Sequence, residues 1–193
     1  MKHALIFGIV LIATGAAVAA EPESPDRVDP VLDCSTPVLD ADTPEQAKLL
    51  RVQFGGDALV RALRETYASR LAGLFWDQLA GKESRLVLRL TGEEPVENNS
   101  MMVCSEPLTV VFVPGAMHAR EELAKLHSSN LEWLRSTFPG LQGTYADERT
   151  GEIVLEVFEP EGGSDVEAFR KEAESRLGAS LRVEMTTAKV VPQ

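Results

Sequence analysis

The fold of this chain is decided by a predicted β-hairpin, Gln142-Gly143-Thr144-Tyr145-Ala146-Asp147-Glu148-Arg149-Thr150-Gly151-Glu152-Ile153-Val154-Leu155-Glu156-Val157-Phe158. In its second half, apolar residues alternate with polar ones, at Ile153, Leu155 and Val157. This alternation is the pattern of a strand that is buried on one face. Residues 147–151 are the polar segment at which the chain reverses, and Gly151 suits the left-handed position that such a turn needs. We expect Asp147 to shape that turn.

The segments on either side of the hairpin complete a regular order of strands and helices. The periodicity predicts a strand at residues 108–113, helices at 119–138 and 164–177, and a last strand at 180–186. The order strand, helix, hairpin, helix, strand is that of the split βαβ, or ferredoxin-like, unit. The sequence therefore predicts an α+β fold with helices packed on small antiparallel sheets, and a βαββαβ unit over residues 107–193.

Residues 43–106 predict a smaller subdomain of two helices and a hairpin. Thr43 and Pro44 are suited to the cap and first turn of a helix. The predicted elements that follow are a helix to residue 54, a helix at 57–70, strands at 72–78 and 85–91, and a loop at 92–106. A helix that leads into a hairpin thus occurs twice, at 57–91 and at 119–158, which is consistent with an internal duplication.

The first 20 residues have the pattern of a secretory signal peptide. A short basic start is followed by an apolar run, and small residues end at Ala20. A retained membrane anchor would need about 20 apolar residues with a suitable flank, whereas acidic residues follow Ala20 at once. We expect export to the periplasm or the medium with cleavage near Ala20, and no membrane anchor afterwards. Residues 21–42, rich in Pro and Asp, predict an extended lead-in.

The charge of the chain bears on its partners. Its 193 residues carry a formal net charge of −11, and removal of the signal peptide takes away one basic residue, Lys2. Binding of nucleic acid needs a basic surface, so nucleic acid is not an expected partner. In an exported chain, the two cysteines, Cys34 and Cys104, favour a disulfide over two separate buried thiols, which remain the alternative.

Catalytic patterns are weak in this sequence. After the signal peptide the histidines are His118 and His127, nine residues apart in a predicted helical stretch and therefore on roughly opposite faces. The chain has no Gly-x-Ser-x-Gly elbow and no His-Glu-x-x-His motif. We therefore expect no catalytic, metal or cofactor site and no enzyme activity, with a hydrolase that uses one of these histidines as the alternative.

Phe75 and Trp76 are the aromatic pair most suited to an interface. They are adjacent in a predicted strand, so one faces each side of the sheet. One is then expected in the core and the other exposed on the opposite face. We take Trp76 as a candidate contact with a partner, because exposed aromatic residues often anchor interfaces.

Two parts of the chain resemble the pro-regions of secreted bacterial chymotrypsin-like serine proteases, of the α-lytic protease and streptogrisin type. The first is Ser69-Arg70-Leu71-Ala72-Gly73-Leu74-Phe75-Trp76-Asp77 with Arg85-Leu86-Val87-Leu88-Arg89-Leu90-Thr91-Gly92. The second is the run from Leu141 to Val157 with Leu181-Arg182-Val183-Glu184. The resemblance covers residues 58–186, and it departs from the family in that no protease domain follows.

The resemblance implies a function in protein binding. Such pro-regions act as folding templates for their protease, add a β-sheet surface to it, and place their C-terminal tail in its active-site cleft. The corresponding tail here is residues 187–193, in which the expected contacts are Val190, Val191, Pro192 and Gln193. We therefore expect an exported, non-catalytic partner of a serine protease, as inhibitor or folding helper. The alternative is a periplasmic or secreted protein-binding module of the cell envelope that has no connection with proteases.

Overall fold

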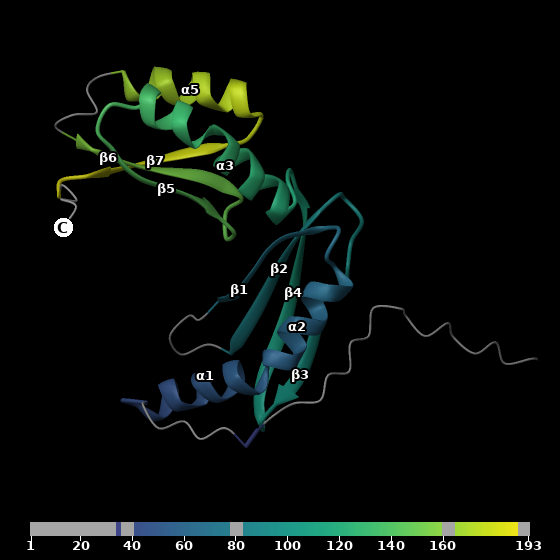
Figure 1. Cartoon of the computed structure of the whole chain (residues 1–193). Helices are drawn as coiled ribbons and strands as arrows, with labels where there is room; N and C mark the ends of the chain where they lie inside the picture. Colours follow the sequence, from purple (N-terminus) through teal and green to yellow (C-terminus); the bar gives the residue numbers. More distant parts are fainter. Residues whose placement is uncertain (1–33, 36–40, 78–82, 160–164, 189–193) are drawn as a thin grey trace, which may run out of the picture.

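The computed structural model describes residues 34–35, 41–77, 83–159 and 165–188, and Figure 1 shows their arrangement. The signal peptide, most of the lead-in and the tail contacts at 190–193 lie outside the described residues. A first unit, residues 44–116, contains α1 (Pro44–Gly55), α2 (Asp57–Thr66), β1 (Leu71–Asp77), β2 (Ser84–Thr91), β3 (Asn99–Val103) and β4 (Glu106–Ala116). A second unit, residues 120–186, contains α3 (Arg120–Thr137), β5 (Leu141–Asp147), β6 (Glu152–Phe158), α5 (Val166–Leu177) and β7 (Leu181–Thr186).

The α+β class is confirmed, but the ferredoxin-like arrangement is wrong. The strand predicted at 108–113 is part of β4, which lies in the first sheet, of order β1-β2-β4-β3. The second sheet has the order β5-β6-β7. β4 joins the first sheet because its apolar residues Leu108 and Val110 pack in the core of the first unit. Both sheets are mixed rather than antiparallel, since β4 runs parallel to β2 and β7 runs parallel to β6.

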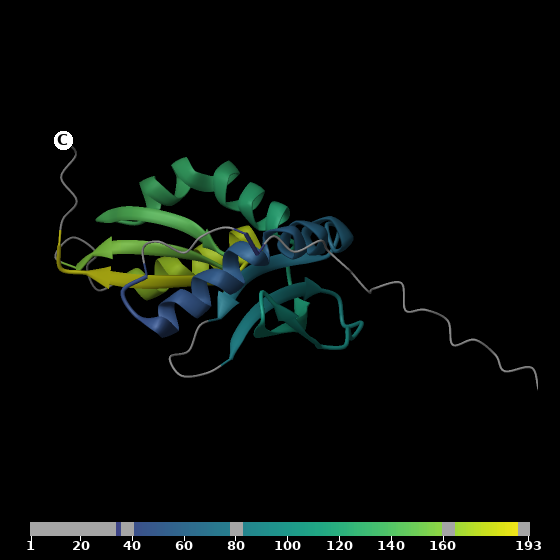
Figure 2. The ribbon, with the colours of Figure 1, turned by 90° about the horizontal axis from the view of Figure 1, so that it is seen from below.

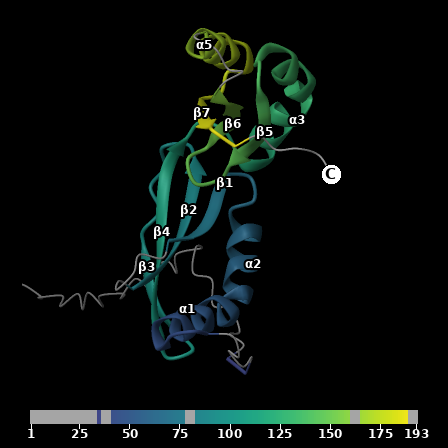
Figure 3. The same ribbon diagram turned by 90° about the vertical axis from the view of Figure 1, so that its left-hand side faces the viewer.

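The first unit is held by helices on one face of its sheet, as Figure 3 shows. The Thr43 side chain accepts a hydrogen bond from the Gln46 amide at 3.1 Å and Pro44 occupies the first turn, which confirms the predicted start of α1. Leu59 and Leu63 of α2 are buried together with Tyr67 and Leu71, which follow the helix at the same four-residue spacing. They pack against alternate residues of the sheet, among them Leu86, Leu88 and Leu90.

The second unit has the same two-layer construction. Helices α3 and α5 lie on one face of sheet β5-β6-β7 and share a core with Ile153, Leu155 and Val157. Seen from below, the strands lie in front of α5 (Figure 2). Gly178 ends α5 with a φ of 65°, the left-handed cap conformation that glycine adopts without a Cβ clash. In the part of the chain that is described, no helix is both long and apolar enough to cross a membrane.

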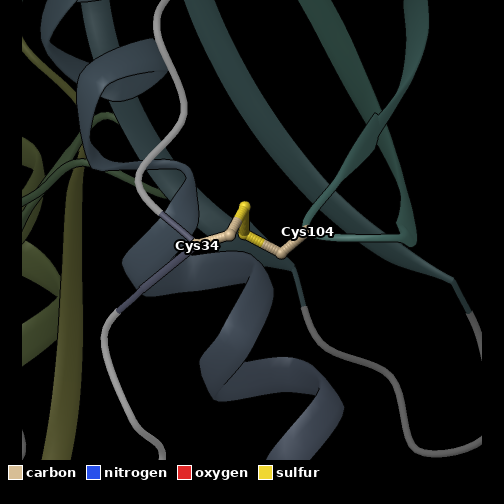
Figure 4. Close-up of a disulfide and its surroundings, with 2 residues drawn as sticks. All are labelled: Cys34 and Cys104. Carbon is tan, nitrogen blue, oxygen red and sulfur yellow. A yellow bond between two sulfur atoms is a disulfide. The ribbon is translucent and has the colours of Figure 1, made fainter.

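Strand β3 was not predicted, because its turn has unusual residues. Residues 99–103 pair with β4 through a two-residue turn, Cys104-Ser105, in which φ is 51° and 66°. Two-residue hairpin turns with positive φ usually carry Asn-Gly or Asp-Gly, so nothing in this sequence indicates a hairpin here. Cys104 forms a disulfide with Cys34, 70 residues away, which confirms the predicted pairing (Figure 4).

The two units repeat one strand arrangement residue by residue. In the first hairpin, Leu71 pairs with Leu90 and Gly73 with Arg89, so that one extra residue forms a bulge between them. In the second, Leu141 pairs with Val157 and Gly143 with Glu156, with a bulge at the same place. Each hairpin is followed by a crossover to a strand parallel to its second strand. This common register supports the internal duplication that the sequence indicated.

Candidate protein-binding surfaces

Each sheet has a face turned away from its helices, which we call the open face. On the first sheet the open face carries Gly73, Phe75, Asp77, Arg85, Val87, Arg89 and Val113. The matching positions of the second sheet hold Gly143, Tyr145, Asp147, Glu152, Val154, Glu156 and Glu184. Helices α3 and α5 both pack on the other face of the second sheet. The two open faces are therefore not covered by the helices of their own units.

The turn between β5 and β6, residues 147–151, rests on the open face of the first sheet. Asp147 shapes it as predicted, since its Oδ1 accepts a hydrogen bond from the Arg149 amide at 2.8 Å. Gly151 has a φ of 77°, which confirms its left-handed position. Asp147 O also accepts the Gly151 amide at 2.7 Å, which closes the turn. The rigid turn can therefore act as a docking element.

Glu148 makes most of the contacts at the junction between this turn and the first sheet. Its backbone lies so close over Gly73 that a Cβ on Gly73 would collide with the Glu148 carbonyl group. Its Oε1 forms an ion pair with Arg120 at 2.6 Å, and its Oε2 accepts a hydrogen bond from the Leu74 amide at 3.5 Å. Arg89 donates to the Glu148 carbonyl oxygen at 3.4 Å. One residue thus joins β1, β2 and α3.

Arg149, the next residue of the turn, also contacts the first sheet. Its guanidinium group lies 5.0 Å from the centroid of the Phe75 ring, a cation–π contact, and it donates to the Trp76 carbonyl oxygen at 3.3 Å. Trp76 was predicted to be the exposed member of the aromatic pair, but its side chain is partly buried and packs against the core of the first unit. Phe75 is the residue on the open face. Neither Glu148 nor Arg149 was singled out from sequence, since turn residues with charges are usually solvated.

Arg89 connects the two open faces electrostatically. It lies on the first sheet, and the carboxylates of Asp147 and Glu152 in the second unit interact with it. Burial lowers the pKa of Arg89, and the two carboxylates partly oppose that shift. The guanidinium group stays charged in any case, because arginine does not lose its proton in proteins. The junction therefore encloses a positive charge supplied by the first unit and negative charges supplied by the second.

The open face of the second sheet is acidic. Arg182 forms ion pairs with Asp147 at 2.8 Å, with Glu152 at 3.0 Å, and with Glu184. The hydrogen bond with Glu152 is the main reason why the pKa of Arg182 is raised. With Glu156, this face holds four carboxylates around one guanidinium group. It thus has the opposite charge balance to the open face of the first sheet, where Arg85 and Arg89 accompany Asp77.

The histidines are engaged in packing contacts. His118 Nε2 donates a hydrogen bond to the Gly178 carbonyl oxygen at 2.8 Å, because a carbonyl oxygen can only accept. His118 Nδ1 lies 3.3 Å from Glu122 Oε1 without an aligned hydrogen bond. His127 Nε2 shares a hydrogen bond with Thr144 Oγ1 at 3.2 Å, and burial lowers the pKa of His127. Among the described residues no group of three or more His, Cys, Asp or Glu side chains is arranged to hold a metal ion.

Two exposed strand edges are further candidates for partner contact. β7 is one edge of the second sheet and leads into the C-terminal residues. β3 is one edge of the first sheet. Each edge carries an exposed methionine: Met185 on β7 is 48% exposed and Met102 on β3 is 59% exposed.

Comparison with known proteins adds no relative. No protein-family model matches the chain, and no curated protein matches it. The likeness to protease pro-regions consequently stays a prediction from the residues quoted above.

Proposed function

We propose that this protein is an exported, non-catalytic module that binds a chymotrypsin-like serine protease in trans, as an inhibitor or a folding helper. The proposal is carried by strand β7, a sheet edge that continues into the C-terminal residues. An edge strand offers a row of unpaired amide and carbonyl groups to which another chain can add a strand. When the edge of such a strand binds a partner, the segment that follows the strand lies close to that partner.

The disulfide and the two-unit architecture support this proposal. A disulfide forms and persists in oxidising compartments, which suits an exported protein. The second unit supports the edge, because β7 pairs along its whole length with the buried strand β6. Both histidines form hydrogen bonds within the second unit, His118 with the Gly178 carbonyl oxygen and His127 with Thr144.

The test is a titration of the oxidised protein into a panel of bacterial chymotrypsin-like proteases, with residual activity and recovery of activity after denaturation as readouts. Met185→Asp places a charge at the β7 edge, where charged side chains oppose strand addition. Met102→Asp makes the same change at the β3 edge and is the matched control. We expect loss of at least tenfold in apparent affinity for the first variant and no change for the second.

Two outcomes count against the proposal. One is the absence of any inhibition or refolding assistance across the panel. The other is an equal loss of affinity in both methionine variants, because this would place the contact away from β7. A chain shortened by residues 187–193 provides a second check, since it should bind through β7 and yet inhibit poorly.

A further inference from the structure

The shared register of the two units indicates what the open face of the second sheet can accept around Gly143, where no other described helix or strand has been found to pack. In the first unit, the glycine after the bulge, Gly73, lies under the backbone of a tight turn, residues 147–151. A cation from that turn sits over the aromatic ring two residues further along the strand, Phe75. The first sheet thus shows both sides of one contact. Its binding surface is a glycine next to a bulge and a nearby aromatic ring, and the bound segment is a β-turn that carries an arginine.

The second unit has a glycine and an aromatic residue at the same positions of its sheet. Gly143 follows its bulge, and Tyr145 lies two residues further, at the position of Phe75. Tyr145 is 42% exposed. The side chain of Glu156, at the position of Arg89, reaches over Gly143, so that a flexible carboxylate occupies the place that the Glu148 backbone takes in the first unit.

The two open faces differ in the charge of the residue next to the glycine. Arg89 of the first unit donates to the Glu148 carbonyl oxygen. Its counterpart Glu156 can only accept, and it is joined on this face by Glu184. A turn that lies over Gly143 must therefore present donors, and the negative charge of the carboxylates favours lysine and arginine among them.

We propose that the open face of sheet β5-β6-β7, centred on Gly143, binds a basic β-turn of another protein. The turn lies over Gly143, its lysine or arginine stacks on the Tyr145 ring as Arg149 does on Phe75, and its donors pair with Glu156 and Glu184. The turn of a second copy of this chain is unsuited, because Glu148 would meet these carboxylates and is already paired with Arg120. This surface is a face of the sheet, whereas the proposed function uses the hydrogen-bonding edge of β7, although Glu184 lies on that strand. The inference therefore extends beyond the proposed function and does not rest on the partner being a protease.

A direct test uses the protein's own turn as a probe. A cyclised peptide of residues 144–155 retains the turn, because cyclisation replaces the sheet support that an isolated hairpin lacks. The form of this peptide with Glu148→Lys and Glu152→Lys, which carries three basic side chains and one acidic one, is added to the whole oxidised chain, and amide chemical shifts are followed by NMR. We expect shifts centred on Gly143, Tyr145 and Glu156, with about tenfold weaker binding for the unchanged peptide.

Two variants locate the contact. Glu156→Lys reverses the proposed charge and should reduce binding of the basic peptide at least tenfold, while Tyr145→Leu should reduce it several-fold. Glu172→Lys makes the same charge change on the exposed side of α5 and should have no effect. The amide spectrum of each variant reports whether it is folded, and Tyr145→Leu retains the test should Glu156→Lys fail to fold.

The inference is overturned by any of three results. These are the absence of shifts around Gly143, equal binding to Glu156→Lys and Glu172→Lys, and equal binding of the basic and unchanged peptides. The last result would indicate association between copies of the chain. Protease inhibition is measured separately, so a failed titration against proteases leaves this test unaffected.

Discussion

The first and second units share one strand register, yet their crossovers and charges differ. Between β2 and β4 the first unit uses a polar loop and the edge strand β3, whereas the second unit uses helix α5 between β6 and β7. The first open face is occupied by a turn of the second unit, and the second open face carries an excess of carboxylates. Two sheets with the same strand register can therefore keep the bulge and its glycine while their open faces carry different charges.

Removal of the disulfide should have the largest effect, and it should act on the first unit. Closing a separation of 70 residues contributes about 4 kcal/mol on the chain-entropy model. In Cys34→Ser/Cys104→Ser we expect β3 and β4 to lose hydrogen-exchange protection before β5, β6 and β7 do. Equal loss of protection in the two units would contradict an effect of the disulfide that acts first on β3 and β4.

Substitution of the two bulge glycines tests the comparison most directly. Gly73→Ala places a methyl group against the Glu148 backbone and should lower the free energy of unfolding by about 1–3 kcal/mol. In Gly143→Ala the methyl group meets the mobile end of the Glu156 side chain, so a change below about 1 kcal/mol is expected. Urea denaturation of both variants measures the difference, and equal effects would mean that the junction does not depend on the close approach at Gly73.

Loss of the Glu148 side chain should have a smaller effect. Glu148→Ala removes a half-exposed ion pair with Arg120 and a long hydrogen bond from the Leu74 amide, which together contribute about 1 kcal/mol. The Leu74 amide should exchange faster. Glu94→Ala, which removes an exposed ion pair with Arg70 inside the first unit, is the control and should leave Leu74 unchanged. Unaltered exchange at Leu74 in Glu148→Ala would contradict the contact.

The smallest effect is expected from pH, and it belongs to the second unit, because residues 44–116 contain no histidine. Burial lowers the pKa of His127, so the folded chain favours the neutral ring. As the pH falls below about 6.5, the unfolded chain binds a proton first and stability decreases until the folded pKa is passed. His127→Gln should remove this component, which is measured as the difference between the two stability curves from pH 7.5 to 5. Parallel curves would contradict the assignment.

The sequence was sufficient to predict most of the elements and the disulfide, but not how the strands are shared between sheets. Local signals are strong where apolar residues alternate, as in the hairpin of Ile153, Leu155 and Val157, or where a cap is present, as at Thr43. The sheet to which β4 belongs is decided by long-range packing of Leu108 and Val110, which periodicity does not encode. β3 was missed because Cys104 and Ser105 are atypical in a turn of positive φ.

The surfaces were harder to predict than the elements. Alternation correctly placed Phe75 and Trp76 on opposite faces, but it does not say which face the helices cover, and the assignment of Trp76 as exposed was wrong. Glu148 and Arg149 have the composition of an ordinary solvated turn. Their function in joining the units follows only from the register that brings Gly73 beneath them.

The disulfide between Cys34 and Cys104 holds the chain together after proteolytic cleavage. A backbone nick anywhere between these two positions would leave two fragments that still migrate as one species on a non-reducing gel. The severed pieces would separate only after treatment with a thiol. The lead-in and the β3–β4 corner thus remain tethered in a damaged molecule for as long as its surroundings stay oxidising.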